Sequence, residues 1–113
     1  MQSLEEVETI RGRDRDLLAQ VKRTIQEILP SATVVLYGSC ARGRQGPESD
    51  YDLYVIAEGP LSTQEEEEVW DAVFQLEIRW TAVISVQFCS RAEWERHGAM
   101  PFHIEVQRDG IIL

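Results

Sequence analysis

Residues 33–57 have the sequence TVVLYGSCARGRQGPESDYDLYVIA, in which two apolar runs flank a polar segment that contains glycine and proline. The runs at about 33–38 and 51–57 predict two β-strands, because they are short, continuous and rich in β-branched and aromatic residues. Glycine and proline between the runs predict a loop over residues 39–50. The sequence therefore predicts two strands joined by a polar loop.

Asp50 and Asp52 lie where the second run begins. Side chains two residues apart on a strand point to the same face, so these two carboxylates are expected to converge. Like charges held this close repel unless a cation neutralises them, and Mg²⁺ favours carboxylate and phosphate oxygens. Gly38 lets the backbone approach a phosphate closely, while Ser39 offers a hydroxyl and its own N–H. A metal-bound nucleotide site is the leading hypothesis, although Gly-Ser is also a common turn and Asp-x-Asp is often a solvated loop edge.

Length and charge limit the class of protein. A chain of 113 residues fits one domain, 1–113, with a single core. Its 20 acidic and 11 basic residues give a formal net charge of −9, which disfavours DNA or RNA as a bulk partner. No apolar run approaches the roughly 20 residues that cross a bilayer, and the acidic N-terminus is unlike a secretory signal. We expect a cytoplasmic protein with no membrane partner.

Periodicity and capping signals predict the other elements. An amphipathic helix is expected over 14–29, ended by Pro30. A second helix is expected to begin near Ser62 or Thr63, because each is followed three residues later by glutamate. Residues 82–89 alternate between apolar and polar side chains and predict a third strand.

The C-terminal part is predicted to contain two short helices and a final strand. Ser90 followed by Glu93 indicates a capped helix, and Pro101 indicates the start of another before the apolar end at 111–113. The alternation over 102–106 also fits a strand, so both alternatives remain open for this segment. The fold class expected from these elements is α/β (α+β), with a small mixed β-sheet packed with helices.

The cysteines and histidines do not form a metal or disulfide pattern, since no CxxC pair or histidine pair at ligand spacing occurs. We interpret Cys40 as a loop residue and Cys89 as a small core residue. His97 and His103 are interpreted as surface or packing residues. The three tryptophans are interpreted as core or interface anchors: Trp70, Trp80 and Trp94.

Residues 38–53 combine glycine-serine, a ten-residue spacer and Asp-x-Asp, and this arrangement resembles the signature of the DNA polymerase β-type nucleotidyltransferase superfamily. The length and the order of elements are similar to those of the minimal nucleotidyltransferases (MNT), and the resemblance covers nearly the whole chain. It implies a polymerase β-like nucleotidyltransferase fold. It also implies transfer of a nucleoside monophosphate from an NTP to an acceptor hydroxyl, with release of pyrophosphate.

Site residues follow from the same resemblance. It implies that Gly38, Ser39 and Arg42 bind the nucleotide, and that Asp50 and Asp52 are catalytic residues that hold Mg²⁺. Active relatives also carry a third carboxylate on a neighbouring strand, which serves as metal ligand or base. In this chain that role falls near Val83, on a face shared with Ser85 and Gln87, none of which is acidic. Glu77 could reach the site only in a shifted register.

Two functions are compatible with this pattern. The first is a Mg²⁺-dependent nucleotidyltransferase that moves AMP from ATP to a hydroxyl of a partner protein, since minimal family members are often paired with a small helical HEPN protein as antitoxin and toxin. The alternative is a catalytically degenerate module that binds and regulates a partner protein without turnover. The intact Gly-Ser and Asp-x-Asp motif favours the first function, and the missing third carboxylate favours the second.

Overall fold

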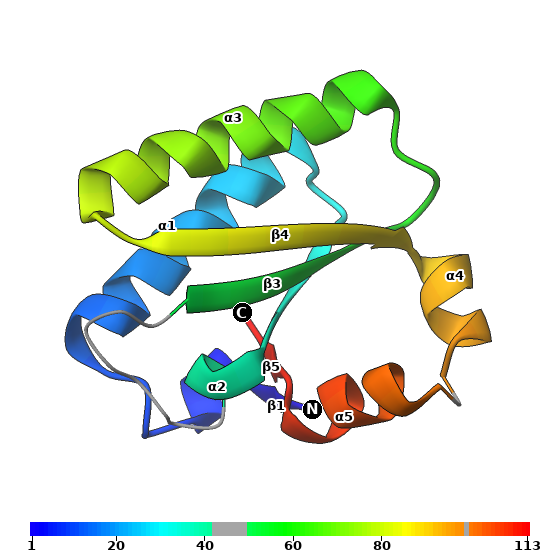
Figure 1. Ribbon diagram of the computed structural model, residues 1–113, viewed down its shortest axis with the longest axis horizontal. Helices are drawn as coiled ribbons and strands as arrows, with labels where there is room; N and C mark the ends of the chain where they lie inside the picture. The colour runs from blue at the N-terminus through cyan, green and yellow to red at the C-terminus, as the bar shows by residue number, and fades with distance from the viewer. Residues whose placement is uncertain (42–49, 99) are drawn as a thin grey trace.

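The computed structural model describes residues 1–41, 50–98 and 100–113, and within them it shows a five-stranded mixed sheet packed with helices (Figure 1). In chain order the elements are β1 (Gln2–Ser3), the 3-10 helix η1 (Leu4–Glu6), α1 (Gly12–Ile28), β2 (Thr33–Tyr37), α2 (Gly38–Ala41), β3 (Asp50–Ala57), α3 (Thr63–Trp80), β4 (Val83–Ser90), α4 (Arg91–Arg96), α5 (Pro101–Asp109) and β5 (Ile111–Ile112). The strand order is β1-β5-β2-β3-β4, with β2 antiparallel to β3 and β5 and with β3 parallel to β4. The expected α/β (α+β) fold class is confirmed.

Side chains of β2 and β3 alternate between two apolar clusters, one on each face of the sheet. On one face Leu36 and Leu53 are fully buried among residues of α1 and α3, which lie side by side (Figure 1). On the other face Val35 and Tyr54 pack against Trp94 of α4 and residues of α5. Each helix therefore buries one apolar stripe, as expected for helices that cover a sheet. Among the described helices, none is both long enough and apolar enough to cross a membrane.

Several predicted helix starts are confirmed by their hydrogen bonds. At the start of α3 the Ser62 hydroxyl accepts from the Glu65 N–H, and the Glu65 carboxylate accepts from the Ser62 N–H. The same reciprocal pair joins Ser90 and Glu93 at the start of α4. The helix expected over 14–29 is α1. These local signals are reliable because both partners lie within one helical turn.

The structure corrects the loop expected over 39–50 and decides between the two alternatives for 102–106. The loop expected over 39–50 begins as the short helix α2, in which Cys40 is fully buried, so its interpretation as a loop residue is wrong. Residues 42–49 lie outside the described residues. Pro101 begins a helix, so the helical alternative holds for 102–106. Cys89 is buried, as expected of a core residue.

The N-terminal segment was not expected to join the sheet, yet β1 pairs with β5 in parallel. Arg15 of α1 holds the segment that follows β1, because its guanidinium donates hydrogen bonds to the backbone carbonyls of Leu4, Val7 and Ile10. A guanidinium has enough donors for three carbonyls at once. This contact joins residues far apart in the sequence, and no local pattern indicates it.

His103 of α5 is a packing residue, as expected, but its burial leaves a polar ring nitrogen without a hydrogen bond among the described residues. Its ring lies 4.6 Å from the Trp94 ring, centroid to centroid, and its Nε2 is buried without a hydrogen-bond partner among the described residues. Burial lowers the pKa of His103, and the nearby His97 lowers it further. The folded protein therefore holds this imidazole in its neutral form more strongly than the unfolded chain does.

We predict that His103 makes the protein sensitive to acid. A lowered pKa in the folded state means that the unfolded chain binds more protons below the ordinary histidine pKa, so the free energy of unfolding falls as the pH falls through that range. His103→Phe removes this contribution. Urea unfolding at about pH 5 and about pH 8 should show a smaller pH dependence for the variant than for the native protein. Equal pH dependence in both proteins would contradict the prediction.

Candidate active site

Asp50 and Asp52 lie on one face of β3 because the residue between them is fixed on the other face. Tyr51 is buried against α1, where its hydroxyl donates a hydrogen bond to Asp14. Burial raises the pKa of Tyr51 and the hydrogen bond to Asp14 raises it further, so the hydroxyl stays protonated and able to donate. With Tyr51 held in this way, the alternation of the strand turns both carboxylates toward the opposite face. Asp50 is exposed and Asp52 is partly buried.

Gly38 lies directly against the second of these carboxylates. In the antiparallel β2–β3 pair, Tyr37 is opposite Asp52, so the end of β2 brings Gly38 to the same place. Gly38 has φ +78°, a conformation that disfavours other residues, and a Cβ built on it would overlap the Asp52 carboxylate. Backbone and carboxylate therefore approach as closely as they do only because position 38 has no side chain.

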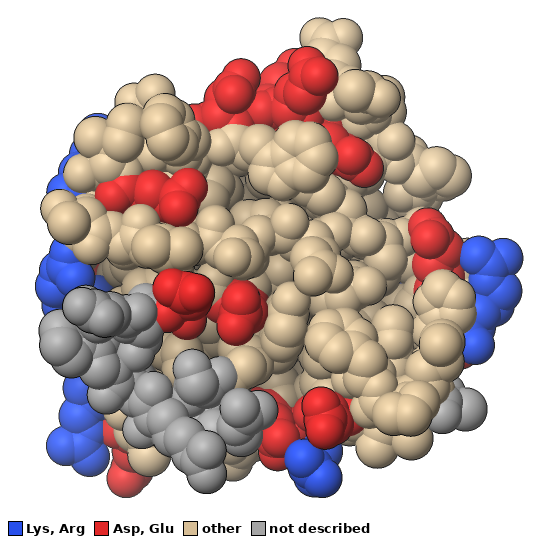
Figure 2. All heavy atoms as spheres, in the orientation of Figure 1, with Lys and Arg blue, Asp and Glu red and all other residues tan. Residues whose placement is uncertain are grey.

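The electrostatic environment of this site favours a cation. Burial raises the pKa of Asp52, and the negative charge of Asp50 raises it further. On the face shown in Figure 2, acidic side chains occur over the sheet, whereas the visible lysines and arginines lie at the margins. A positive ion between the carboxylates would offset the repulsion between Asp50 and Asp52.

Two carboxylates fit Mg²⁺ when a phosphate ligand completes its coordination. Mg²⁺ is commonly bound by one or two carboxylates, several waters and substrate phosphates rather than by a cage of protein ligands. Within the described residues, no group of three or more His, Cys, Asp or Glu side chains could hold a metal. Asp50 and Asp52 are thus suited to a metal that arrives with a nucleotide.

The neighbouring strand β4 contributes no acidic side chain to this face over its described length. In the parallel β3–β4 pair, Val83 is opposite Asp50 and Ser85 is opposite Asp52. Both β4 side chains are exposed. Glu77, at the end of α3, accepts a hydrogen bond from the backbone N–H of Ile84 at 3.0 Å and so has a structural role at the start of β4.

The other expected nucleotide ligands are only partly described. Ser39 belongs to α2, next to Gly38. Arg42 lies outside the described residues, so its assignment as a nucleotide-binding residue stays a prediction. Gly38 and the two aspartates are therefore the site residues that the structure places together.

Sequence reasoning missed a pocket next to Gly38. The pocket has a volume of about 190 Å³ and is lined by Tyr37, Gly38, Phe102, Glu105, Val106 and Asp109. Four of these residues belong to α5, which lies on the same face of the sheet as the carboxylates. The sequence contains only a weak signal for this pocket, namely side chains four residues apart on a helix. This spacing indicates a pocket only once α5 is known to pack beside α2.

We predict that Gly38→Ala destabilises the protein more than Gly12→Ala does. Gly12 also has a positive φ, +58°, but a Cβ there would meet nothing within 4 Å. Gly12→Ala should therefore cost only the backbone strain, about 1–2 kcal/mol. Gly38→Ala adds the overlap with Asp52. Urea unfolding should show the larger loss for Gly38→Ala, and equal losses would contradict the close approach.

The fold is similar to that of two solved structures. One is a mutant form of the toxin-antitoxin MntA-HpeT, with a TM-score of 0.59 and 18% identity, covering 85% of this chain and 70% of that chain. The other is a toxin-antitoxin with AMP-PNP, with a TM-score of 0.55 and 18% identity, covering 86% of this chain and 69% of that chain. At this level of identity the likeness concerns the fold alone.

A relative and a family model extend the comparison to sequence. The probable protein adenylyltransferase MntA of Haemophilus influenzae is 33% identical over 63 residues, which are 56% of this chain and 55% of that protein, so the match spans about half the length of the curated relative. The family model for the nucleotidyltransferase domain matches residues 18–106, which include Gly38, both site carboxylates and all of β4. The chain belongs to the nucleotidyltransferase domain family.

Proposed function

We propose that this protein is a Mg²⁺-dependent nucleotidyltransferase that moves AMP from ATP to a hydroxyl of a partner protein, as an MNT antitoxin paired with a small helical HEPN-type protein. The observation that carries the proposal is the approach of Asp52 to Gly38, with Asp50 on the same face. The Haemophilus influenzae relative, named as a probable protein adenylyltransferase, supports AMP and a protein acceptor. The neighbour with AMP-PNP supports an ATP-like nucleotide.

In this proposal the carboxylates and the β2–α2 junction position the nucleotide. Mg²⁺, when bound, would supply positive charge that offsets the negative charge developing on the leaving pyrophosphate. Asp50 and Asp52 hold the metal, and Gly38, Ser39 and Arg42 bind the triphosphate. The acceptor oxygen attacks the α-phosphorus, and the bond from that phosphorus to the oxygen it shares with the β-phosphate breaks. Catalysis then depends mainly on positioning and electrostatics.

A second candidate function is regulation of a partner by binding without turnover. The register of β4 favours it, because Val83 and Ser85 stand next to the site carboxylates and neither can accept a proton at neutral pH. In an active enzyme, the proton of the acceptor hydroxyl would pass to solvent or to a basic group of the acceptor protein. The enzymatic function therefore requires solvent or the partner to take the acceptor proton, whereas the binding function does not.

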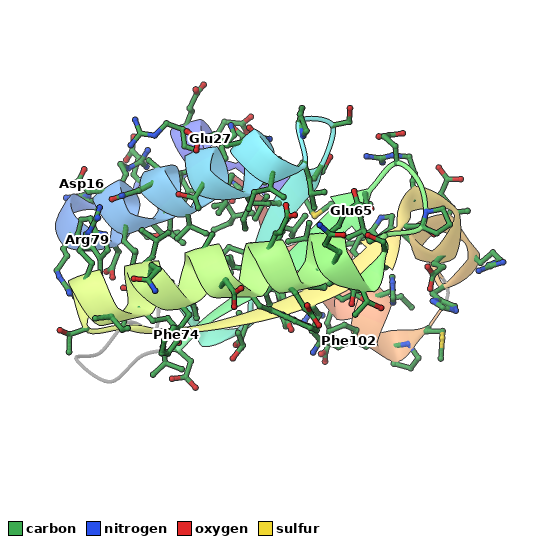
Figure 3. The ribbon with its side chains drawn as sticks, turned by 90° about the horizontal axis from the view of Figure 1, so that it is seen from above. Asp16, Glu27, Glu65, Phe74, Arg79 and Phe102 are labelled. Carbon is green, nitrogen blue, oxygen red and sulfur yellow. The ribbon has the colours of Figure 1, made fainter. Side chains whose placement is uncertain are left out.

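An exposed apolar stripe on α3 supports the proposal that a protein docks on this helix. Trp70, Phe74 and Ile78 are each about half exposed, at 46%, 54% and 60%, and they recur every four residues, so they share one face. Figure 3 shows that Phe74 points away from α1. Exposed Glu67 and Asp71 belong to the same face and would complement basic groups on the small helical partner.

The enzymatic proposal predicts that radiolabelled AMP is transferred from ATP to the small helical HEPN-type partner protein in the presence of Mg²⁺. Replacing both carboxylates, with Asp50→Asn and Asp52→Asn, should abolish the transfer. Asp16→Asn, at an exposed position on α1, serves as the matched control and should retain it. Complex formation is measured in parallel by size-exclusion chromatography. A stable complex with no label transferred by the native protein would reject turnover and leave the binding function standing.

The docking proposal predicts that Phe74→Asp weakens the complex with the same partner by at least about 10-fold in Kd, since buried aromatic anchors dominate interface energies. Phe74 is 54% exposed, so the fold should tolerate the change. Ile104→Asp, at a 50% exposed position on α5, is the control and should leave Kd unchanged. If both variants bind like the native protein, the partner docks elsewhere.

A further inference from the structure

The pocket between α5 and the β2–α2 junction continues the candidate active site. Tyr37 lines the pocket and is opposite Asp52 in the antiparallel β2–β3 pair, and directly opposed side chains share a face of the sheet. Gly38 lines the same pocket and lies so close to the Asp52 carboxylate that a Cβ at residue 38 would overlap it. A ligand with phosphates at Asp50 and Asp52 would therefore have this pocket, of about 190 Å³, as its neighbour.

The aromatic ring of Phe102 forms one wall of the pocket and packs against two other aromatic rings. The Phe102 and Tyr37 rings pack at nearly right angles, with 5.5 Å between ring centroids, and the Phe102 centroid lies 6.1 Å from that of Tyr54. The side chain nevertheless remains 42% exposed, so these contacts do not bury all of it. Exposed aromatic faces at a binding site are suited to stacking with a nucleobase, because every base has a π-face.

The carboxylates of α5 limit which chemical groups of a ligand can lie in the pocket. Glu105 and Asp109 are one helical turn apart and both line the pocket. Ionised carboxylates accept hydrogen bonds and do not donate them, so they favour N–H and O–H groups and repel phosphate. Asp109 is paired with Arg108 at 3.1 Å, whereas Glu105 is exposed. These carboxylates disfavour a phosphate in the pocket and accept N–H and O–H donors, while Phe102 offers an apolar surface to a planar group. A nucleoside meets both conditions, and a triphosphate does not.

We propose that this pocket binds the nucleoside part of the substrate, with the base stacked on Phe102 and a ribose hydroxyl or base N–H donating to Glu105. The inference rests on the proposed function, because it takes the triphosphate to lie at Gly38 and the two aspartates. It adds a direction to the bound nucleotide, from the metal site toward α5. It also assigns to α5 a role in affinity that the nucleotidyltransferase motif does not contain.

Calorimetric titration with ATP and with inorganic triphosphate, each with Mg²⁺, tests this assignment. Phe102→Ala should weaken ATP binding roughly 10-fold, as expected for the loss of one stacking contact, and leave triphosphate binding unchanged. Glu105→Ala should also lower the preference for ATP over triphosphate. Ile104→Ala, on the same helix but outside the pocket, should keep the native preference. Titration with 2′-deoxy-ATP and with UTP then separates a 2′-hydroxyl donor from the exocyclic amine of adenine.

Each result separates the inference from the function on which it rests. If Phe102→Ala and Glu105→Ala bind ATP as the native protein does, or weaken ATP and triphosphate equally, the nucleoside lies elsewhere while the proposed function stands. If the native protein binds neither ligand with Mg²⁺, both the proposed function and the inference are overturned. Thermal unfolding of each variant confirms that any loss of binding is not a loss of fold.

Discussion

Two like charges on one face of β3 are the constraint around which this structure is arranged. Asp50 and Asp52 cannot turn away from each other, because Tyr51 between them is buried and donates a hydrogen bond to Asp14 of α1. A buried hydrogen-bonded tyrosine fixes the facing of the whole strand, since a shift by one residue would exchange the two faces. The core on one side of the sheet thus determines the chemistry exposed on the other.

The close approach of Gly38 to Asp52 follows from this arrangement. Antiparallel pairing of β2 with β3 brings Tyr37 opposite Asp52, and the turn that follows has room for the carboxylate only because residue 38 lacks a Cβ. Parallel pairing with β4 places Val83 and Ser85 on the remaining side. The proposed metal and phosphate site therefore lies on the β2 side of the carboxylates, and β4 adds no carboxylate on the other side. In the proposed reaction, the group that takes the acceptor proton would have to come from solvent or from the acceptor protein.

Local sequence signals predicted most of the secondary structure and the face shared by the two carboxylates. The capping boxes at Ser62 and Ser90 and the alternation in β3 and β4 act within a few residues, so they can be recognised without the fold. Contacts between distant segments could not be recognised in this way. Arg15 holding the N-terminal segment, Cys40 buried in α2, and α5 packed beside α2 all depend on tertiary packing.

The proposed function depends on Asp50 and Asp52 holding a metal-bound nucleotide whose phosphates lie against Gly38. A crystal structure with Mg²⁺ and a non-hydrolysable ATP analogue tests it most directly. We expect Mg²⁺ between the two carboxylates and the phosphates, the phosphates beside Gly38, and the nucleoside directed toward Phe102 of α5. Nucleotide bound away from Gly38, or a metal held without either carboxylate, would contradict it.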